Sequence, residues 1–362
     1  MKYSDEYRDK KLAEHISRSI KDIMPSTGIM FMEVCGTHTQ NFLRFGLDKL
    51  IPPNLDLISG PGCPVCVSTQ QYIDQAISYA RMKDMIILTF GDMLKVPGSS
   101  SSLEKENAQG ADVRILYSPF DSLRVARENP KKKVILLAVG FETTAPTIAL
   151  TLIAAKKEKI KNLFFFSALK LIPAAMAHLL ADKKLNIHGF LCPGHVSAII
   201  GTRPYDFIPD KFKIGCCIAG FEPLDILQGL YFLLKQVKDH KPAVKNQYLR
   251  VVKAQGNPEA KKIMEKVFQE EDSCWRGLGM IPQSGLKIRN GFSQFDAARV
   301  FRTKNAAHQA RGKTQCRCAD VLKGLISPEV CPLFGEACRP DNPYGPCMVS
   351  SEGTCNAYYR YK

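Results

Sequence analysis

The chain of 362 residues contains 13 cysteines whose uneven spacing favours metal or redox chemistry. Cys63 and Cys66 form a C-x-x-C pair within GPGCPVC at 60–66, and Pro64 stiffens the turn between them. This spacing serves either a dithiol/disulfide couple or half of a tetrahedral metal site. Because the frame is built of glycine and proline, we expect two exposed thiols rather than core residues.

A second cysteine motif is MEVCGTHT at 32–39, in which Cys35 leads from an expected strand into an expected helix. The positive end of a helix dipole lowers the pKa of a cysteine at that place, so we expect a reactive thiolate. His38 lies three residues further on and can ligate a metal or form a hydrogen bond. The alternative is a buried structural cysteine beside a core histidine.

Two further candidate site residues follow later strands. Glu142 lies beside two threonines in GFETTAP at 140–146, and His195 follows Pro-Gly. Each side chain can line a site, although the threonines can also cap a helix and His195 can bond to a backbone carbonyl. Four cysteines have no partner pattern and are expected to be small buried hydrophobic residues: Cys192, Cys216, Cys217 and Cys274.

The C-terminal region is rich in cysteine and proline and cannot build an apolar core of its own. We therefore expect metal–thiolate bonds to hold it together. Four thiolates hold an iron–sulfur cubane and also suit zinc, and the spacing here matches neither the ferredoxin run nor a zinc-finger pattern. The six cysteines of this region are Cys316, Cys318, Cys331, Cys338, Cys347 and Cys355.

The elements that must position these residues follow from hydrophobic periodicity. Short apolar runs alternate with helical stretches, which predicts parallel strands covered by helices on both faces. Ligands of such sheets bind outside the carboxyl ends of the strands. Every motif up to residue 223 directly follows one of the apolar runs. The loops that carry these motifs should therefore meet in one or two crevices. The predicted strands are 29–34, 55–59, 85–90, 113–117, 134–139, 163–167, 189–192 and 214–219. The predicted helices are 5–24, 39–50, 70–83, 119–128, 146–157 and 223–237.

The strands suggest two α/β lobes rather than one large sheet, because AVGFE at 138–142 is echoed by IAGFE at 218–222. We assign 26–130 to the first lobe and 131–240 to the second. A mainly helical and irregular third domain would combine 1–25 with 241–362.

Within that third domain, residues 246–270 are predicted to be helical. The sequence GLGMIPQSG at 277–285 indicates an irregular segment rich in turns.

Charge and hydropathy exclude several classes of function. The net charge is +15, but the basic residues are scattered and no nucleic-acid-binding signature is present, so we expect no nucleic-acid partner. The N-terminal segment has no apolar core, and the apolar stretch 163–180 is interrupted by Lys170, Pro173 and His178, so we expect neither a signal peptide nor a membrane span. A cytoplasmic protein with reduced thiols is expected.

Eight sequence blocks spread over residues 28–360 carry a family resemblance. They are MEVCGTHT (32–39), GPGCPVCV (60–67), FGDMLKVPG (90–98), GFETTAPT (140–147), PGHVSAIIG (193–201), AGFEPLDILQG (219–229), NQYLRVV (246–252) and CPLFG…SSEGTC (331–355). Together these blocks resemble the HypD family of [NiFe]-hydrogenase maturation factors.

The resemblance implies an assembly scaffold with two α/β lobes and a third domain that carries a [4Fe-4S] cluster. Such a protein pairs with a small chaperone, HypC, and holds the ferrous iron that becomes the Fe(CN)2CO centre of the hydrogenase. Cyanide would come from the HypE–HypF pair. Cys35 matches the essential cysteine of the family, and Cys63 and Cys66 match its C-x-x-C pair.

The family's cluster block maps onto Cys318, Cys331, Cys338 and Cys355 and leaves Cys316 and Cys347 outside. Low-spin ferrous iron with cyanide and CO prefers soft thiolate ligands, and Cys35 can supply one. The dithiol can store two electrons and the cluster can relay single electrons. Two rival functions remain: a stand-alone thiol–disulfide reductase fed by the cluster, and a zinc-stabilised binding module without redox chemistry.

Overall fold

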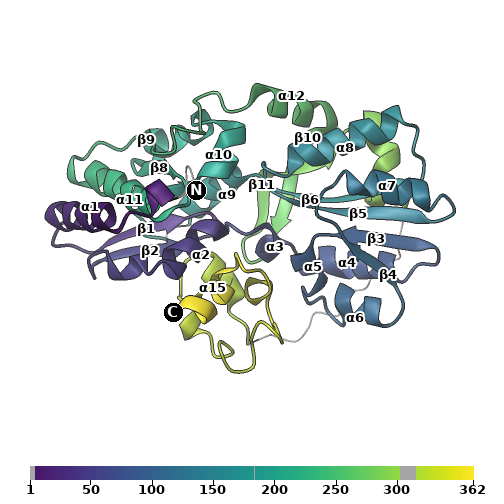
Figure 1. Cartoon of the computed structure of the whole chain (residues 1–362), viewed down its shortest axis with the longest axis horizontal. Helices are drawn as coiled ribbons and strands as arrows, with labels where there is room; N and C mark the ends of the chain where they lie inside the picture. The colour runs from purple at the N-terminus through teal and green to yellow at the C-terminus, as the bar shows by residue number, and fades with distance from the viewer. Residues whose placement is uncertain (1–4, 183, 302–314) are drawn as a thin grey trace.

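The computed structural model describes residues 5–182, 184–301 and 315–362. Two parallel β-sheets with helices packed around them lie side by side, and the C-terminal segment packs below their junction in the view of Figure 1. The predicted α/β class with two parallel sheets is confirmed.

All eight predicted strands form, because strands buried on both faces read as continuous apolar runs. Sheet A has five parallel strands in the order β2 (Leu55–Ser59), β1 (Ile29–Glu33), β7 (Gly189–Pro193), β8 (Gly215–Ala219) and β9 (Val244–Asn246). Sheet B has four in the order β4 (Asp112–Ile115), β3 (Met85–Thr89), β5 (Lys133–Gly140) and β6 (Leu163–Leu169).

The strands do not divide between the sheets at residue 130, where we placed the lobe boundary. β1 pairs with β7, with Phe31 opposite Gly189, whereas β3 pairs with β4 and β5. Sheet B is therefore inserted in the chain between β2 and β7 of sheet A. The periodicity of the sequence shows where strands lie but not which strands are neighbours, so it could not reveal this insertion.

Helices pack around both sheets. Those with sheet A are α1 (Lys10–Ile23), α2 (Gly36–Arg44), α10 (Gly194–Ile200) and α11 (Pro223–Lys238). Those of the sheet B region are α4 (Gln70–Ala80), α5 (Gly91–Leu94), α6 (Leu103–Ala108), α7 (Asp121–Glu128) and α8 (Ala145–Lys157), and α9 (Ile172–Leu180) leads back to sheet A. The remaining short helices of the α/β region are η1 (Asp5–Tyr7), η2 (Leu47–Lys49), α3 (Pro64–Val67), η3 (Arg203–Tyr205) and η4 (Ile208–Phe212).

The core has one apolar cluster for each sheet and a third between the sheets. Phe31 and Leu191 lie in the cluster of sheet A, and Ile86 lies in that of sheet B. The third cluster surrounds Trp275 and Tyr79, which are both 1% exposed. The junction between the lobes is thus filled with side chains, which fixes the loops that meet there.

A β-hairpin follows sheet A in the chain. Helix α12 (Pro258–Val267) leads into antiparallel strands β10 (Phe268–Trp275) and β11 (Gly279–Ile288), followed by η5 (Asn290–Phe295) and α13 (Ala297–Val300). The predicted helix over 246–270 is therefore wrong outside α12, and most of the segment that we read as irregular is strand. In β10 only the terminal Phe268 and Trp275 are buried. The acidic run between them has no apolar residues whose spacing could distinguish a strand from a helix.

The C-terminal segment contains only short elements: α14 (Cys318–Leu322), η6 (Pro328–Val330), η7 (Pro346–Met348) and α15 (Thr354–Tyr361). Helix α15 packs against α2, which follows Cys35. Within the described residues, no helix has both the length and the apolar character needed to cross a membrane.

Candidate functional site

Cys35 lies at the carboxyl end of β1 and is the N-cap residue of α2. Its side chain is buried, and its Sγ lies 3.8 Å from Nδ1 of His195, which follows β7. Because β1 and β7 are neighbouring parallel strands, their carboxyl ends bring both side chains to one edge of sheet A. The expected convergence of these two loops is confirmed.

His38 joins this site through the loop that follows β8. Its Nε2 donates a hydrogen bond to the carbonyl oxygen of Gly220 at 2.9 Å, and its ring centroid lies 5.0 Å from that of Phe221. The ring of His195 lies 5.3 Å from Phe221, so one phenyl ring contacts both imidazoles. Nδ1 of His38 is buried and has no hydrogen-bond partner among the described residues.

Burial controls the protonation of this site. It raises the pKa of the Cys35 thiol far above its ordinary value, contrary to the thiolate that we expected at a helix start, because desolvation outweighs the helix dipole. It also lowers the pKa values of His38 and His195 to about 4, so both imidazoles are neutral at pH 7. The neutral imidazole of His195 therefore puts no positive charge beside the Cys35 sulfur.

Glu33 is a site residue that the sequence did not single out. It is 1% exposed at the end of β1, and its carboxyl group accepts hydrogen bonds from the Cys35 N–H at 2.7 Å and from the Thr39 hydroxyl. Burial raises its pKa to about 7. A glutamate that ends a strand normally indicates solvent exposure, so only its place in the MEVC block hinted at this role.

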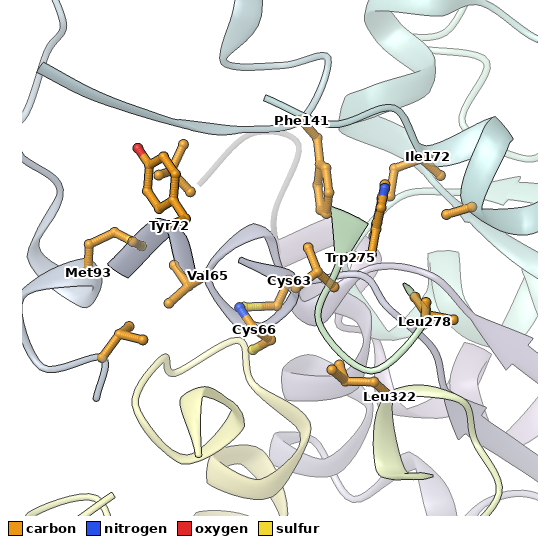
Figure 2. Close-up of a cluster of buried hydrophobic side chains, with 14 of the residues drawn as sticks. Cys63, Val65, Cys66, Tyr72, Met93, Phe141, Ile172, Trp275, Leu278 and Leu322 are labelled. Carbon is orange, nitrogen blue, oxygen red and sulfur yellow. The ribbon is translucent and has the colours of Figure 1, made fainter. Parts of the chain in front are cut away.

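Cys63 and Cys66 lie at the N-cap and inside the single turn of α3, where Figure 2 shows them among buried apolar side chains. They are 4% and 0% exposed, so the expectation of exposed thiols is wrong. The glycines and prolines of this loop serve close packing instead: a Cβ on Gly62 would lie 2.1 Å from the backbone nitrogen of Cys35. The dithiol loop therefore packs directly against the Cys35 turn.

The two thiols of this pair differ in acidity. Burial raises the pKa of Cys66, but hydrogen bonds with the thiols of Cys347 and Cys63 outweigh burial and bring it down to about 6. The pKa of Cys63 is raised well above its ordinary value by burial and by its neighbour Cys66. The Cys66 N–H also donates to Cys63 Sγ at 3.3 Å. The pair can thus hold one thiolate and one thiol at neutral pH.

The six cysteines of the C-terminal segment surround one small pocket, together with Val321, Phe334, Gly345 and Met348. Among the described residues, no group of three or more His, Cys, Asp or Glu side chains is arranged to hold a metal ion. The Tyr344 N–H donates to Cys338 Sγ at 3.3 Å, a contact that favours a thiolate. The four cysteines implied by the resemblance are thus brought together, but Cys316 and Cys347 lie with them.

Cys347 connects the pocket to the dithiol. Its Sγ lies 3.1 Å from Cys318 Sγ, and its thiol also interacts with those of Cys355 and Cys66. Cys66 Sγ is 3.8 Å from the carbonyl oxygen of Pro346, the residue before Cys347. Cys347 lay outside the family pattern, so spacing alone gave no reason to choose it.

The C-terminal segment also reaches Cys35. The Thr37 hydroxyl donates to Oε1 of Glu352 at 2.7 Å, and a Cβ on Gly36 would lie 2.2 Å from the Glu352 carbonyl oxygen. Gly36 is required there because any side chain would push the segment away from α2. The Cys35 turn, the dithiol loop and the cysteine-lined segment therefore form one continuous packed unit.

Glu142 does not belong to this unit. It follows β5, which is a strand of sheet B, so the strand-end rule places it at the edge of the other sheet. Its Oε1 accepts a hydrogen bond from the Ile172 N–H at 3.0 Å, and burial raises its pKa to about 8. Four cysteines were expected to be small buried residues. Three of them, Cys192, Cys216 and Cys217 in sheet A, are buried, and the fourth, Cys274 in β10, is half-buried.

Comparison with known proteins gives a consistent result over the whole chain. The HypD family model, described as "Hydrogenase formation hypA family", matches residues 9–362. The chain is 44% identical over 370 residues to "Hydrogenase maturation factor HypD" of Escherichia coli (strain K12), with 100% of this chain and 98% of that protein covered. It is 42% identical over 370 residues to "Hydrogenase maturation factor HypD2" of Bradyrhizobium diazoefficiens, covering 100% and 97%. It is 44% identical over 369 residues to "Hydrogenase expression/formation protein HupD" of Azotobacter chroococcum, again covering 100% and 97%.

Proposed function

The chain belongs to the HypD family of hydrogenase maturation factors, and from this premise we propose that it is the scaffold on which the Fe(CN)2CO moiety is assembled. In this proposal a HypC-type chaperone supplies a second thiolate to the iron, and HypE with HypF supplies cyanide. The assembly takes place in the cytoplasm, where thiols stay reduced.

The observation that carries the proposal is the position of Cys35. Its sulfur lies at the edge of sheet A, where the loops after β1, β7 and β8 meet, and sulfur is the donor that low-spin ferrous iron prefers. Binding of iron displaces the thiol proton, and the neutral His195 puts no positive charge beside the sulfur that would oppose the metal. The Cys35 turn therefore offers a soft ligand with a neutral imidazole 3.8 Å from it.

Cys63 and Cys66 are proposed to be the electron store of the scaffold. Oxidation of the two thiols to a disulfide releases two electrons and two protons. The low pKa of Cys66 supplies the thiolate from which that oxidation begins, and the contact of Gly62 with Cys35 keeps the store beside the iron ligand. The Cys35 motif and the C-x-x-C motif, which are separate in the sequence, are therefore in direct contact in the fold.

A [4Fe-4S] cluster fits the cysteine-lined pocket by the chemistry of its donors, because each iron of a cubane takes one thiolate and the six thiols surround a common pocket. When bound, such a cluster supplies single electrons. Cys331, Cys338 and Cys355 are proposed ligands, and the resemblance implies Cys318 as the fourth. Cys316 lines the same pocket and is the other candidate for the fourth position.

One observation disfavours a stand-alone disulfide reductase. The loop of Cys63 and Cys66 packs against Cys35, which would have no role in such a reductase. Turnover of a disulfide substrate by the purified protein would support that rival. A zinc-stabilised binding module would be colourless, whereas protein with a cluster is brown.

The test of the proposal is anaerobic co-purification with the chaperone, followed by infrared spectroscopy. Bands of iron-bound cyanide and CO are expected on the complex and should be missing from chaperone purified alone. A complex that forms but never carries these bands, even when HypE and HypF are present, would refute the scaffold function.

A further inference from the structure

The block NQYLRVV at 246–252 begins at the last residue of β9 and has no part in the function proposed above. Three of its side chains, Gln247, Tyr248 and Arg250, contact the start of α11 or the loop before it. This loop, residues 220–222 between β8 and α11, is called the GFE loop below. The same loop contacts the Cys35 site, so it joins the block to that site.

Arg250 makes the strongest of these contacts. Its Nη1 and Nη2 donate to Oδ1 and Oδ2 of Asp225 at 2.8 and 2.5 Å, and Asp225 is 0% exposed in the first turn of α11. The guanidinium carbon also lies over two aromatic rings, 4.4 Å from the centroid of Tyr248 and 3.8 Å from that of Tyr7. A bidentate ion pair combined with two ring contacts fixes the orientation of a guanidinium group.

The N-terminal segment contacts the same place. Tyr7 ends helix η1, which packs against α11. The next residue, Arg8, donates to both carboxylate oxygens of Glu222, the N-cap residue of α11, with its Nη2 at 3.0 Å from Oε1. The GFE loop is therefore held by residues that come from both the N-terminal segment and the NQYLRVV block.

The backbone of the GFE loop connects Arg250 to His38. The Gly220 N–H donates to Oε1 of Gln247 at 3.1 Å, and a Cβ on Gly220 would lie 2.2 Å from Oδ2 of Asp225. The carbonyl oxygen of the same glycine accepts the hydrogen bond from Nε2 of His38. A shift of the ion pair would therefore move the acceptor of that imidazole.

The side chain of the loop makes a second connection. The ring centroid of Phe221 lies 6.1 Å from that of Tyr248, which is itself in contact with the guanidinium group. The same phenyl ring contacts the imidazoles of His38 and His195. The path from the NQYLRVV block to the site thus runs through this ring as well as through the backbone of the loop.

We propose that Arg250 is a positioning residue of the Cys35 site. It holds the GFE loop where Gly220 can accept the hydrogen bond from His38, and it thereby selects the imidazole tautomer that carries its proton on Nε2. It also keeps the ring of Phe221 against both imidazoles. The proposal deepens the scaffold function, because it concerns the same site, but its test needs neither iron at Cys35 nor the chaperone.

The first measurement is the NMR resonance of the His38 Nε2 proton in the full-length anaerobic protein labelled with 15N-histidine. A buried, hydrogen-bonded imidazole proton exchanges slowly with water and gives its own resonance, which His38→Gln assigns by removing it. We expect this resonance in the wild type and its loss in Arg250→Gln.

The second measurement is the rate at which iodoacetamide alkylates Cys35, followed by mass spectrometry of the peptides. Arg250→Gln should raise this rate by at least about 10-fold, because removal of one partner of a buried ion pair lets the loop open locally. Cys216, which is 0% exposed in β8, serves as the internal reference and should react no faster.

Arg81→Gln is the matched control. Arg81 forms the same kind of bidentate pair with a buried carboxylate, Glu106, in the sheet B region, with distances of 2.8 and 2.7 Å. This variant should leave both the His38 resonance and the alkylation rate of Cys35 as in the wild type.

If Arg250→Gln does not fold, Tyr7→Leu decides the question, because it removes one of the two rings from Arg250 in the N-terminal segment. It should raise the alkylation rate of Cys35 by about 3-fold.

Three results would overturn the inference: an unchanged His38 resonance in Arg250→Gln, equal acceleration at Cys35 and Cys216, or the same losses in Arg81→Gln. Arg250 would then be a purely structural residue. If both measurements come out as expected but the protein never carries cyanide and CO bands with the chaperone, the scaffold function fails and the positioning role of Arg250 stands.

Discussion

At Cys35, a buried thiol and a buried carboxyl group share one small volume with the half-buried imidazole of His195. Desolvation holds each group in its neutral form or in a hydrogen bond rather than as a free charge. A metal ion that enters can replace the thiol proton with its own charge. The burial that makes Cys35 unreactive as a free thiol thus suits it to hold a metal.

Replacement of Cys35 by serine should remove the iron site alone. Serine is nearly isosteric but offers a hard, protonated oxygen that low-spin iron binds poorly. The cyanide and CO infrared bands of the chaperone complex should disappear, while the brown absorption of the cluster persists. Cys274→Ser, which changes a half-buried thiol in the hairpin, should retain the bands. Bands of full strength in Cys35→Ser would move the iron to another ligand, with Cys63, Cys66 and His195 as the candidates.

The cluster ligands can be separated by single alanine substitutions. We expect the anaerobically purified protein to hold about four irons and four sulfides, and Cys331→Ala, Cys338→Ala and Cys355→Ala should each bleach it. They should also lower its stability, since metal binding there is also folding energy.

The informative comparison is between the two cysteines that compete for the fourth position. We expect Cys318→Ala to lose the cluster and Cys316→Ala to keep it, because the cluster block of the family maps onto Cys318. The opposite result would place Cys316 in the ligand set instead of Cys318. Zinc without labile sulfide on elemental analysis would exclude a cluster altogether.

At the scale of elements, the single turn of α3 determines the chemistry of the dithiol. Pro64 begins the turn, and the Cys66 N–H points back at Cys63 Sγ. Hydrogen bonds with the thiols of Cys347 and Cys63 lower the pKa of Cys66 and favour its thiolate. The pKa of Cys63 is raised, which favours its protonated form. Helix α3 and its N-cap residue therefore provide both the thiolate of Cys66 and the thiol of Cys63 that a disulfide needs.

A reversible disulfide between Cys63 and Cys66 is expected from this turn. Thiol trapping with mass spectrometry should find the bond in oxidising glutathione buffer and lose it in reducing buffer. Cys274 should remain alkylated in both buffers, which controls for general oxidation. If the two cysteines stay unpaired over the whole range of redox buffers, a role purely as metal ligands would replace the electron store.

The elements also show what the sequence could predict. Strands such as β2 and β5 were found to within a residue or so, since a strand buried on both faces is apolar throughout. β10 was missed because its exposed acidic residues conceal the alternation of apolar and polar residues that marks a strand. Cys35 and His195 could be paired from the strand-end rule, whereas Glu33 and Cys347 could not, because burial and contacts across more than 200 residues leave no local pattern.

At the scale of the whole molecule, two units that differ in chemistry share one fold. The Cys35 turn, the dithiol loop and the cysteine-lined segment pack around the edge of sheet A. The buried Glu142 follows a strand of sheet B. The junction cluster around Trp275, part of which Figure 2 shows, lies between the two sheets and holds them together.

The buried Glu142 should make the stability of the whole molecule depend on pH. Its pKa is raised from 4.5 to about 8 by burial, so between these values the folded protein keeps a proton that the unfolded chain releases. Its stabilising contribution is complete below pH 4.5 and is lost as the pH rises toward 8, by up to about 1.4 kcal/mol per pH unit.

This dependence is measured as the difference in free energy of unfolding between wild type and Glu142→Gln from pH 5 to pH 8. The variant should gain stability relative to wild type as the pH rises, because glutamine does not titrate. Glu265→Gln, with its exposed carboxylate, should show a flat difference. A flat difference for Glu142→Gln as well would mean that Glu142 is ionised and paired in the folded protein.

The insertion of sheet B between β2 and β7 also sets an order of events during synthesis. β1 and β2 leave the ribosome first, but the other neighbour of β1 lies 158 residues later, at the Met30–His188 contact that precedes β7. The four strands of sheet B are consecutive in the chain and can close into a lobe while the β1–β2 ribbon still has an unpaired edge. That open edge is a place where nascent chains can pair wrongly. Sheet A, which carries Cys35, is therefore begun before sheet B and completed after it.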